Sequence, residues 1–418
     1  MGSEAEGREE GRTCRQKEKV SLISETDHRL IPEVNIGTLG HVDHGKSTLV
    51  EAISGKWPAL HSEELKRGIT IKLGYADATI YKCPKCGKML STDKCLGCME
   101  KAEPIRTISF VDAPGHETLM ATVLAGASLM DGALLIIAAN EKCPQPQTAE
   151  HLLALDISGI KKIIIIQNKI DVVTEEGAKE SYKQIKEFVK GTVAENAPII
   201  PVSAQQKLNI DMVLEAIQEF IPTPKRDPSA NPRMLVVRSF DINKPGTEPE
   251  KIKGGVLGGA ILEGKLKVGE QVEISPVKIG EKWQSITTEI TGLQKASKNI
   301  DEAGPGGLVG VMTKLDPFLT KADSISGSVV GLPGKMPPIM NSLKMKFNLF
   351  KDTDPVKVGE NLMIIVGTSK TIGTVDAIKK GVGEINLKIP VVISHNDRAA
   401  ISRNINDRWK LIGWGATA

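Results

Sequence analysis

Glycine, lysine and serine recur near the start of the chain at a spacing that suits phosphate binding. The segment Gly40-His-Val-Asp-His-Gly-Lys-Ser47 fits the pattern G-x-x-x-x-G-K-[ST], with an apolar run before it and a helix-forming run after it. Glycines let backbone N–H groups close around phosphate oxygens, and the N-terminus of a following helix adds positive potential. Lys46 would reach the β- and γ-phosphates of a nucleoside triphosphate, and the Ser47 hydroxyl would bind Mg²⁺.

The segment Asn168-Lys-Ile-Asp171 follows the apolar run Ile163–Gln167 and predicts which base is bound. The carboxylate of Asp171 can accept hydrogen bonds from both N1–H and the N2 amine of guanine. Adenine offers neither donor, and such a mismatch discriminates by roughly 10⁴-fold. Asn168 would brace this loop or approach the base, and Ser203 and Ala204 would place a backbone amide near guanine O6. The nucleotide is therefore predicted to be GTP or GDP.

Two further motifs lie between the phosphate loop and the guanine motif. In Asp112-Ala-Pro-Gly115-His116 the acid can hold Mg²⁺ through water, and Gly115 lets its backbone N–H approach a γ-phosphate. We expect His116 to orient the attacking water, with a structural surface histidine as the alternative. In Arg67-Gly-Ile-Thr70 the threonine can ligate Mg²⁺ while γ-phosphate is present, which would make an order–disorder switch.

Lys46, Thr70 and His116 are accordingly the expected catalytic residues. The predicted nucleotide-binding set is Asp43, His44, Gly45, Lys46, Ser47, Thr48, Gly115, Asn168, Lys169, Asp171, Ser203, Ala204 and Gln205.

Four of the six cysteines form two C-x-x-C pairs within sixteen residues, Cys83–Cys86 and Cys95–Cys98. Each pair can present two thiolates to one metal, and four sulfurs in a tetrahedral array favour Zn²⁺. A redox C-x-x-C motif is the alternative, but two copies without a thioredoxin-like context argue against it. We expect a structural zinc knuckle. Because it falls between Thr70 and Asp112 in the sequence, it is predicted to lie in the switch region.

The elements around these motifs predict an α/β domain and two β-barrels. Short apolar runs alternate with amphipathic stretches from Pro32 to about Ile221, which is typical of a doubly wound, mainly parallel sheet. Proline-rich breaks at Pro222–Pro232 and Leu332–Pro338 separate two β-rich segments. The expected division is an arm or expression tail at 1–31, a nucleotide-binding domain at 32–225 with the knuckle at 83–98, and barrels at 226–335 and 336–418.

Composition bears on the kind of partner and on the cellular compartment of the protein. A formal net charge of +3 neither requires nor excludes a nucleic-acid partner. No apolar run approaches the ~20 residues that span a bilayer, and the N-terminus lacks the apolar core of a secretory signal. Paired cysteines suit a metal site in a reducing compartment. A cytoplasmic protein that does not span a membrane is therefore expected.

Taken together, the five nucleotide motifs resemble those of the translational GTPases, and a nucleotide-binding domain followed by two barrels looks like elongation factor Tu. Further segments are similar to the γ-subunit family of archaeal and eukaryotic translation initiation factor 2. The resemblance covers nearly everything from Pro32 to Trp414. The segments that carry it are His61–Gly68, Asp112–Thr122, Gln145–Thr148, Ser239–Thr247, Gly254–Gly259 and Arg408–Trp414.

The resemblance implies a factor that, in its GTP form, carries methionylated initiator tRNA to the small ribosomal subunit. It implies a heterotrimer in which an α subunit docks on the first barrel and a β subunit docks on the nucleotide-binding domain. It also implies that Val42 and Ile69 flank the path of His116 to the water. Asp43 and the backbone of Gly68 look like ligands of a second Mg²⁺.

Two alternatives remain at this point. One is a factor of the elongation type, which would deliver an elongator aminoacyl-tRNA. The other is a scaffold that holds GTP and partners but hydrolyses GTP slowly without help, because the sequence supplies no obvious arginine finger in cis. Arg398, Arg403, Arg408 and Lys410, with Trp409 and Trp414 among them, can either meet RNA or form the solvated face of a barrel.

Overall fold

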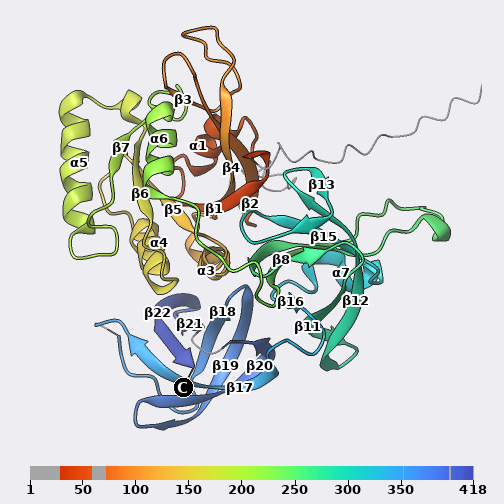
Figure 1. Cartoon of the computed structure of the whole chain (residues 1–418). Coiled ribbons are helices and arrows are strands. Elements are labelled where there is room, and N and C mark those ends of the chain that lie inside the picture. Colours follow the sequence, from red (N-terminus) through yellow and green to blue (C-terminus); the bar gives the residue numbers. More distant parts are fainter. Residues whose placement is uncertain (1–28, 59–71, 352, 395–396, 418) are drawn as a thin grey trace, which may run out of the picture.

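The computed structural model describes residues 29–58, 72–351, 353–394 and 397–417, which form an α/β domain and two barrels (Figure 1). The predicted roles of Gly68, Ile69 and Thr70 fall on residues outside these ranges, as does most of the expected N-terminal arm. Residues 29–31 of that arm are described. The backbone oxygen of Arg29 accepts a hydrogen bond of 2.9 Å from the Thr107 hydroxyl.

The α/β domain is built on seven strands in the order β3-β2-β4-β1-β5-β6-β7. Within the described residues, β4, β1, β5, β6 and β7 run parallel, and β2 and β3 add an antiparallel edge. The expected doubly wound, mainly parallel sheet is confirmed. The strands are β1 (Pro32–Leu39), β2 (Gly74–Lys82), β3 (Met89–Leu90), β4 (Glu103–Asp112), β5 (Gly132–Ala138), β6 (Ile163–Asn168) and β7 (Ile199–Pro201).

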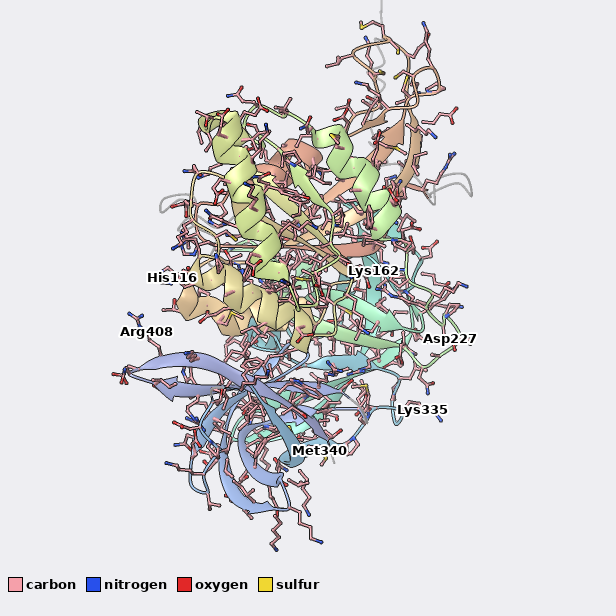
Figure 2. The ribbon with its side chains drawn as sticks, turned by 90° about the vertical axis from the view of Figure 1, so that its left-hand side faces the viewer. His116, Lys162, Asp227, Lys335, Met340 and Arg408 are labelled. Carbon is pink, nitrogen blue, oxygen red and sulfur yellow. The ribbon has the colours of Figure 1, made fainter. Side chains whose placement is uncertain are left out.

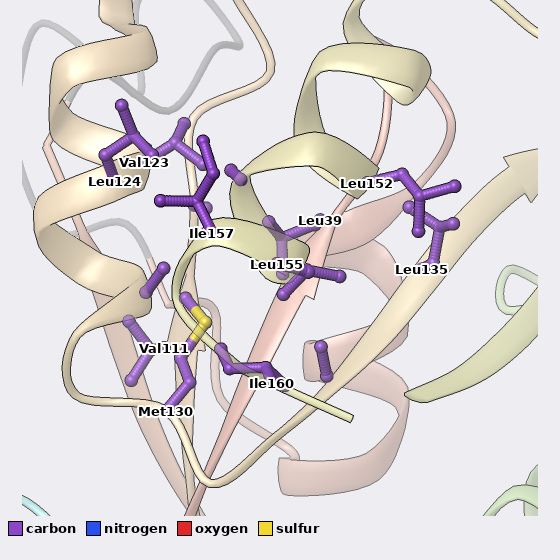
Figure 3. Packing of buried hydrophobic residues seen from close by; sticks show 14 of the residues in the cluster. Leu39, Val111, Val123, Leu124, Met130, Leu135, Leu152, Leu155, Ile157 and Ile160 are labelled. Atoms are coloured by element: carbon purple, nitrogen blue, oxygen red, sulfur yellow. The ribbon is translucent and has the colours of Figure 1, made fainter. Parts of the chain in front are cut away.

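Helices cover both faces of this sheet because successive side chains of its strands point to opposite sides. Along β5, Leu134 and Ile136 join one apolar cluster, with α1 and α6, while Leu135 and Ile137 join the other, with α3, α4 and α5. In the second cluster Leu152 and Leu155 of α4 turn toward β5 and β1 (Figure 3). The helices are α1 (Lys46–Ser54), α3 (Met120–Ala127), α4 (Pro146–Ile157), α5 (Glu175–Val189) and α6 (Ile210–Phe220).

The first barrel is antiparallel and follows the order β11-β16-β8-β9-β15-β12, closed by pairing of β11 with β12. Its interior holds Met234, Leu257, Ile274 and Ile290, all fully or almost fully buried. A short helix, α7 (Pro317–Thr320), lies outside the ring. The strands of the ring are β8 (Arg233–Phe240), β9 (Val256–Glu263), β11 (Gln271–Ile279), β12 (Lys282–Lys295), β15 (Val309–Thr313) and β16 (Val329–Gly331). Outside the ring, β13 (Lys298–Ile300) pairs with β12, and β10 (Leu266–Lys267) and β14 (Glu302–Ala303) form a separate two-stranded sheet.

The second barrel closes in the order β17-β20-β19-β18-β21-β22. Its strands alternate buried and exposed positions, as expected when one face lines a core and the other faces water. Both expected barrels are therefore confirmed. The strands are β17 (Ile339–Leu349), β18 (Asn361–Val366), β19 (Ser369–Lys379), β20 (Val382–Val392), β21 (Arg398–Ile405) and β22 (Arg408–Thr417).

Polar contacts hold the second barrel against the other two domains. Arg233 of β8 pairs with Asp397 at 2.5 Å, just before β21. Arg398 of β21 donates to the Ile157 carbonyl at 3.4 Å, at the end of α4, and its guanidinium lies 4.3 Å from the centre of the Trp414 ring. The hairpin that carries Arg408 lies on the same side of the molecule as His116 (Figure 2).

Candidate functional site

The predicted phosphate loop lies where β1 ends and α1 begins. Gly40 has φ of 142° and Gly45 has φ of 88°, and a Cβ on Gly40 would come within 2.2 Å of the Ile136 carbonyl oxygen. Only glycine fits at such a position. A cavity of about 330 Å³ opens over the loop. Its lining residues are Val42, Asp43, Gly45, Lys46, Ser47, Thr48, Trp57, Gly115, His116 and Lys169.

Lys46 is buried at the floor of this cavity. Its Nζ donates a hydrogen bond of 2.7 Å to the His41 carbonyl within the same loop. Burial lowers the pKa of Lys46 to about 8, although the carboxylates of Asp112 and Asp43 act in the opposite direction. A dehydrated ammonium group gains strongly from an anion placed beside it. Lys46 is therefore positioned to pair with phosphate.

Asp112 is the last residue of β4, and its carboxylate accepts hydrogen bonds from β1 and from the start of α1. Parallel pairing of β1 with β4 places Thr38 opposite Asp112, and the Thr38 hydroxyl donates to Oδ1 at 2.6 Å. The Ser47 hydroxyl donates to Oδ2 of the same carboxylate, also at 2.6 Å. Hydroxyl and carboxylate oxygens are ligands that Mg²⁺ prefers. The side chains of Ser47 and Asp112 therefore fit a Mg²⁺ site, and Asp43 is exposed at its rim.

Gly115 and His116 lie directly above the lysine. A Cβ on Gly115 would come within 2.5 Å of Lys46 Nζ and 2.9 Å of the Val42 nitrogen, so glycine is needed for this close approach. His116 lines the cavity with an exposed ring, and its Nδ1 lies 3.0 Å from the Thr118 hydroxyl. The imidazole is thus at the open end of the phosphate cavity, where water has access.

Asn168 links three of the predicted motifs. Its Nδ2 donates to the His44 carbonyl of the phosphate loop at 2.9 Å, and its Oδ1 accepts from the Ala204 backbone nitrogen at 3.0 Å. Asn168 is buried, so both bonds are protected from water. In this structure the side chain braces the loops.

The other residues of the guanine motif are more open. Lys169 has φ of 62° and lines the phosphate cavity, and Asp171 follows in a short 3₁₀ turn with an exposed side chain. Ser203 is buried and its hydroxyl accepts from the Gln206 nitrogen at 3.2 Å, whereas Gln205 is exposed. The exposed carboxylate of Asp171 is therefore available to a base that enters from solvent.

Two buried residues support the site without having been singled out for these contacts. His151 of α4 accepts a hydrogen bond of 2.8 Å from the Gly40 nitrogen, and Thr38 holds Asp112. Thr38 could have been noticed in the sequence, because it is a polar residue near the end of the apolar run Val34–Leu39. No local pattern marks His151, because its partner lies 111 residues away.

The four predicted zinc ligands come together. Their sulfur atoms lie within 4.8 Å of one another, and Sγ of Cys86 is 3.8 Å from Sγ of Cys95. Sulfurs at the corners of a tetrahedron with Zn–S bonds of about 2.3 Å are separated by about 3.8 Å. Each knuckle is closed by its own backbone hydrogen bond: the Cys83 nitrogen donates to the Lys88 carbonyl at 3.0 Å, and the Cys95 nitrogen donates to the Glu100 carbonyl at 2.9 Å. The cluster therefore fits structural Zn²⁺.

The knuckle lies away from Asp112, which is the part of the predicted switch region that the structure describes. Gly74 of β2 pairs with Asp112 of β4, whereas Lys82, next to the first cysteine, pairs with Glu103. The cysteines therefore lie at the opposite end of these strands, roughly 30 Å from Asp112 at ~3.3 Å per residue. Figure 1 shows the insert at the edge of the α/β domain, near α6. A β-hairpin carries its tip away from its base, so the cysteines lie far from Asp112 although they are close to it in sequence.

The fold and the site together define a P-loop GTPase with two appended barrels, the class of the translational GTPases. Residues 32–223 match the family "Elongation factor Tu GTP binding domain", 254–331 match "Elongation factor Tu domain 2", and 340–417 match "Initiation factor eIF2 gamma, C terminal".

Among curated proteins, translation initiation factor 2 subunit gamma of Methanocaldococcus jannaschii is 56% identical over 397 residues, covering 92% of this chain and 97% of that protein. The proteins of the same name from Pyrococcus abyssi and Archaeoglobus fulgidus are 57% and 54% identical, covering 92% and 95% of this chain and 97% and 96% of their own lengths. This chain belongs to the family of translation initiation factor 2 gamma subunits. As a member, it is a GTP-hydrolysing protein that uses GTP, GDP and Mg²⁺.

Solved structures of two elongation factors share the fold. A bacterial selenocysteine-specific elongation factor superposes with a TM-score of 0.73 at 23% identity, over 93% of this chain and 58% of that one. Elongation factor SelB from Methanococcus maripaludis superposes with a TM-score of 0.70 at 21% identity, over 93% of this chain and 79% of its own. At such identities the likeness concerns the fold alone. Among the described residues, no helix is long and apolar enough to cross a bilayer.

Proposed function

We propose that this chain, in its GTP form, carries methionylated initiator tRNA to the small ribosomal subunit and releases it after hydrolysis. It acts in the cytoplasm within a heterotrimer, with an α subunit on the first barrel and a β subunit on the α/β domain. The observation that supports this proposal is the extent of the match. Identity of 54–57% covers nearly the whole of the gamma-subunit relatives, and it includes the second barrel.

For the nucleotide site we propose the following roles. Lys46 pairs with the β- and γ-phosphates, Ser47 and Asp112 hold Mg²⁺ (Asp112 through water), and Asp171 accepts from guanine. The bound Mg²⁺ supplies neutralisation of the charge on the phosphate oxygens. His116 orients the attacking water from the open end of the cavity, with Val42 and Ile69 flanking its path. Thr70 joins the Mg²⁺ ligands, and Asp43 and Gly68 hold a second Mg²⁺.

The test of cargo is filter binding with two tRNAs. The GTP-bound chain, assembled with its α subunit, is titrated with initiator and with elongator methionyl-tRNA, and GDP-bound chain serves as the control. We expect tighter binding of the initiator species, and only in the GTP form. A preference for the elongator species would favour the elongation-factor alternative and contradict the proposal.

A second candidate function concerns hydrolysis, and the exposure of His116 favours it. The ring of His116 is exposed, and its described hydrogen-bonding contacts are with its near neighbour Thr118, whose hydroxyl lies 3.0 Å from Nδ1. On that basis the isolated chain is a GTP-holding scaffold that hydrolyses slowly until a partner orders the ring. Single-turnover hydrolysis with and without the small ribosomal subunit and an activating factor tests this. Fast hydrolysis by the isolated chain, abolished in His116→Ala, would refute it.

A further inference from the structure

A buried histidine on α4, His151, contacts Gly40 at the start of the phosphate loop. His151 is 1% exposed, and its Nδ1 lies 2.8 Å from the backbone nitrogen of Gly40, the first residue of the loop. Later residues of the loop, such as Val42 and Gly45, line the nucleotide cavity, whereas Gly40 and His151 are not among its lining residues. His151 therefore acts on the loop without touching the nucleotide.

The hydrogen bond fixes the protonation state of the ring. Gly40 N–H can only donate, so Nδ1 must carry no proton and the imidazole must be neutral. Burial lowers the pKa of His151 to about 3, and the positive potentials of Lys46, His41 and His44 act in the same direction. The ring is thus a neutral acceptor over the whole range in which the protein works.

Gly40 is constrained from a second direction. Its φ is 142°, and the Ile136 carbonyl oxygen lies 2.2 Å from where a Cβ would stand. The backbone of Gly40 therefore has little room to change its conformation. The next residue, His41, offers its carbonyl to Lys46 Nζ at 2.7 Å. A shift of Gly40 would therefore move the acceptor that places the lysine ammonium group.

We propose that His151 is a positioning residue of the nucleotide site, which holds the phosphate loop in its binding conformation through Gly40 N–H. Without the acceptor, a buried N–H loses its partner and the loop relaxes away from this arrangement. Binding of nucleotide must then restore the arrangement, so affinity falls. The alternative is that His151 merely fills space in the core around α4, in which case only stability would change.

Three variants separate these possibilities. His151→Asn keeps an acceptor close to the position of Nδ1, His151→Leu removes it while remaining large and apolar, and Leu155→Ala removes a fully buried side chain elsewhere on α4. The dissociation constant for a fluorescent GDP analogue with Mg²⁺, and the midpoint of thermal unfolding, are measured on each full-length chain.

We expect His151→Leu to bind GDP about tenfold more weakly, and His151→Asn to stay within about threefold of the unchanged chain. Leu155→Ala should unfold at a lower temperature yet bind GDP normally at 25 °C. Unchanged affinity in His151→Leu would overturn the proposal. Equal weakening in His151→Asn would also overturn it, as would equal weakening in Leu155→Ala, because the effect would then follow stability rather than the acceptor.

Discussion

Lys72 of the α/β domain lies 2.6 Å from Asp323 of the first barrel, measured from Nζ to Oδ2. Asp323 also accepts from Arg238 Nε at 2.9 Å and from the Ser239 nitrogen at 3.0 Å. The Asp323 carboxylate thus accepts hydrogen bonds from donors of two domains. The backbone of Asp323 has φ of 62°, in the left-handed region. A non-glycine residue stays in this region only where its surroundings hold it. Lys72 is two residues from Thr70, so the contact ties the sequence next to the predicted γ-phosphate sensor to the barrel.

The first prediction concerns this carboxylate. Asp323→Ala should lower the free energy of unfolding by about 1–2 kcal/mol, since three donors lose an acceptor but the two cationic groups remain accessible to water. The midpoint of urea unfolding provides the measurement. Glu289→Ala is the matched control, because Glu289 pairs with an exposed lysine, Lys314, at 2.8 Å and should contribute about 0–1 kcal/mol. Equal shifts in both variants would contradict the prediction.

The same carboxylate should make stability depend on pH. Burial by itself raises the pKa of Asp323, but hydrogen bonds from Lys72, Ser239 and Arg238 outweigh it and hold the pKa below its usual value. A lowered carboxyl pKa stabilises the fold above the unfolded value of about 3.9 and loses that contribution as pH falls through the folded pKa. The difference between the unchanged chain and Asp323→Ala should therefore shrink below pH ~4. A difference that stays constant down to pH ~2.5 would count against this carboxylate as its source.

The second prediction concerns proton uptake by Lys46. Burial lowers its pKa to about 8, and phosphate beside the ammonium group should raise it again. At pH 8 the binding of GDP should then take up about half a proton, and affinity should fall as pH rises above 8. Calorimetry in buffers of different ionisation enthalpy measures this uptake. It should vanish at pH 6.5, where Lys46 is already charged, and heats independent of buffer at pH 8 would refute the prediction.

The third prediction concerns the base. Asp171→Asn replaces one acceptor by an amide that also donates, so it loses a bond to guanine and gains one to the C2 carbonyl of xanthine. GTP affinity should fall by roughly 100-fold or more, and xanthosine triphosphate should bind in its place. Competition against a fluorescent GDP analogue gives both values. Glu176→Gln, an exposed neighbour on α5, should change neither, and a loss of GTP binding without gain of xanthosine triphosphate would contradict the assigned role.

The fourth prediction follows from the place of the cysteine cluster. Cys86→Ser should abolish stoichiometric zinc and speed hydrogen exchange in residues 83–103, because the metal closes both knuckles. GDP affinity should stay within about threefold, since the cluster and Asp112 lie at opposite ends of β4. Metal content, exchange mass spectrometry and GDP titration measure these quantities. Cys143→Ser should leave zinc unchanged, and a tenfold loss of GDP affinity in Cys86→Ser would show that the knuckle does reach the nucleotide site.

Much of this molecule follows from sequence because the deciding features are local. The run Ile163–Ile166 is apolar at every position, so a strand covered on both faces was predictable, and β6 (Ile163–Asn168) is buried along its whole length. The glycines of the phosphate loop and the alternation of the barrel strands are equally local. The two C-x-x-C pairs predicted a cluster for the same reason, and their sulfurs lie together.

The tertiary structure decided which segments far apart in the sequence contact one another. The hairpin of β2 and β4 carries the zinc cluster away from Asp112, although the two are neighbours in sequence. Asn168 bridges the phosphate loop to Ala204, His151 supports Gly40, and Lys72 reaches Asp323 across 251 residues. The sequence shows the chemical type of each side chain, but it does not show which distant residue that side chain contacts. Partners depend on strand order and domain packing, which the summed burial of many apolar residues determines and no short motif encodes.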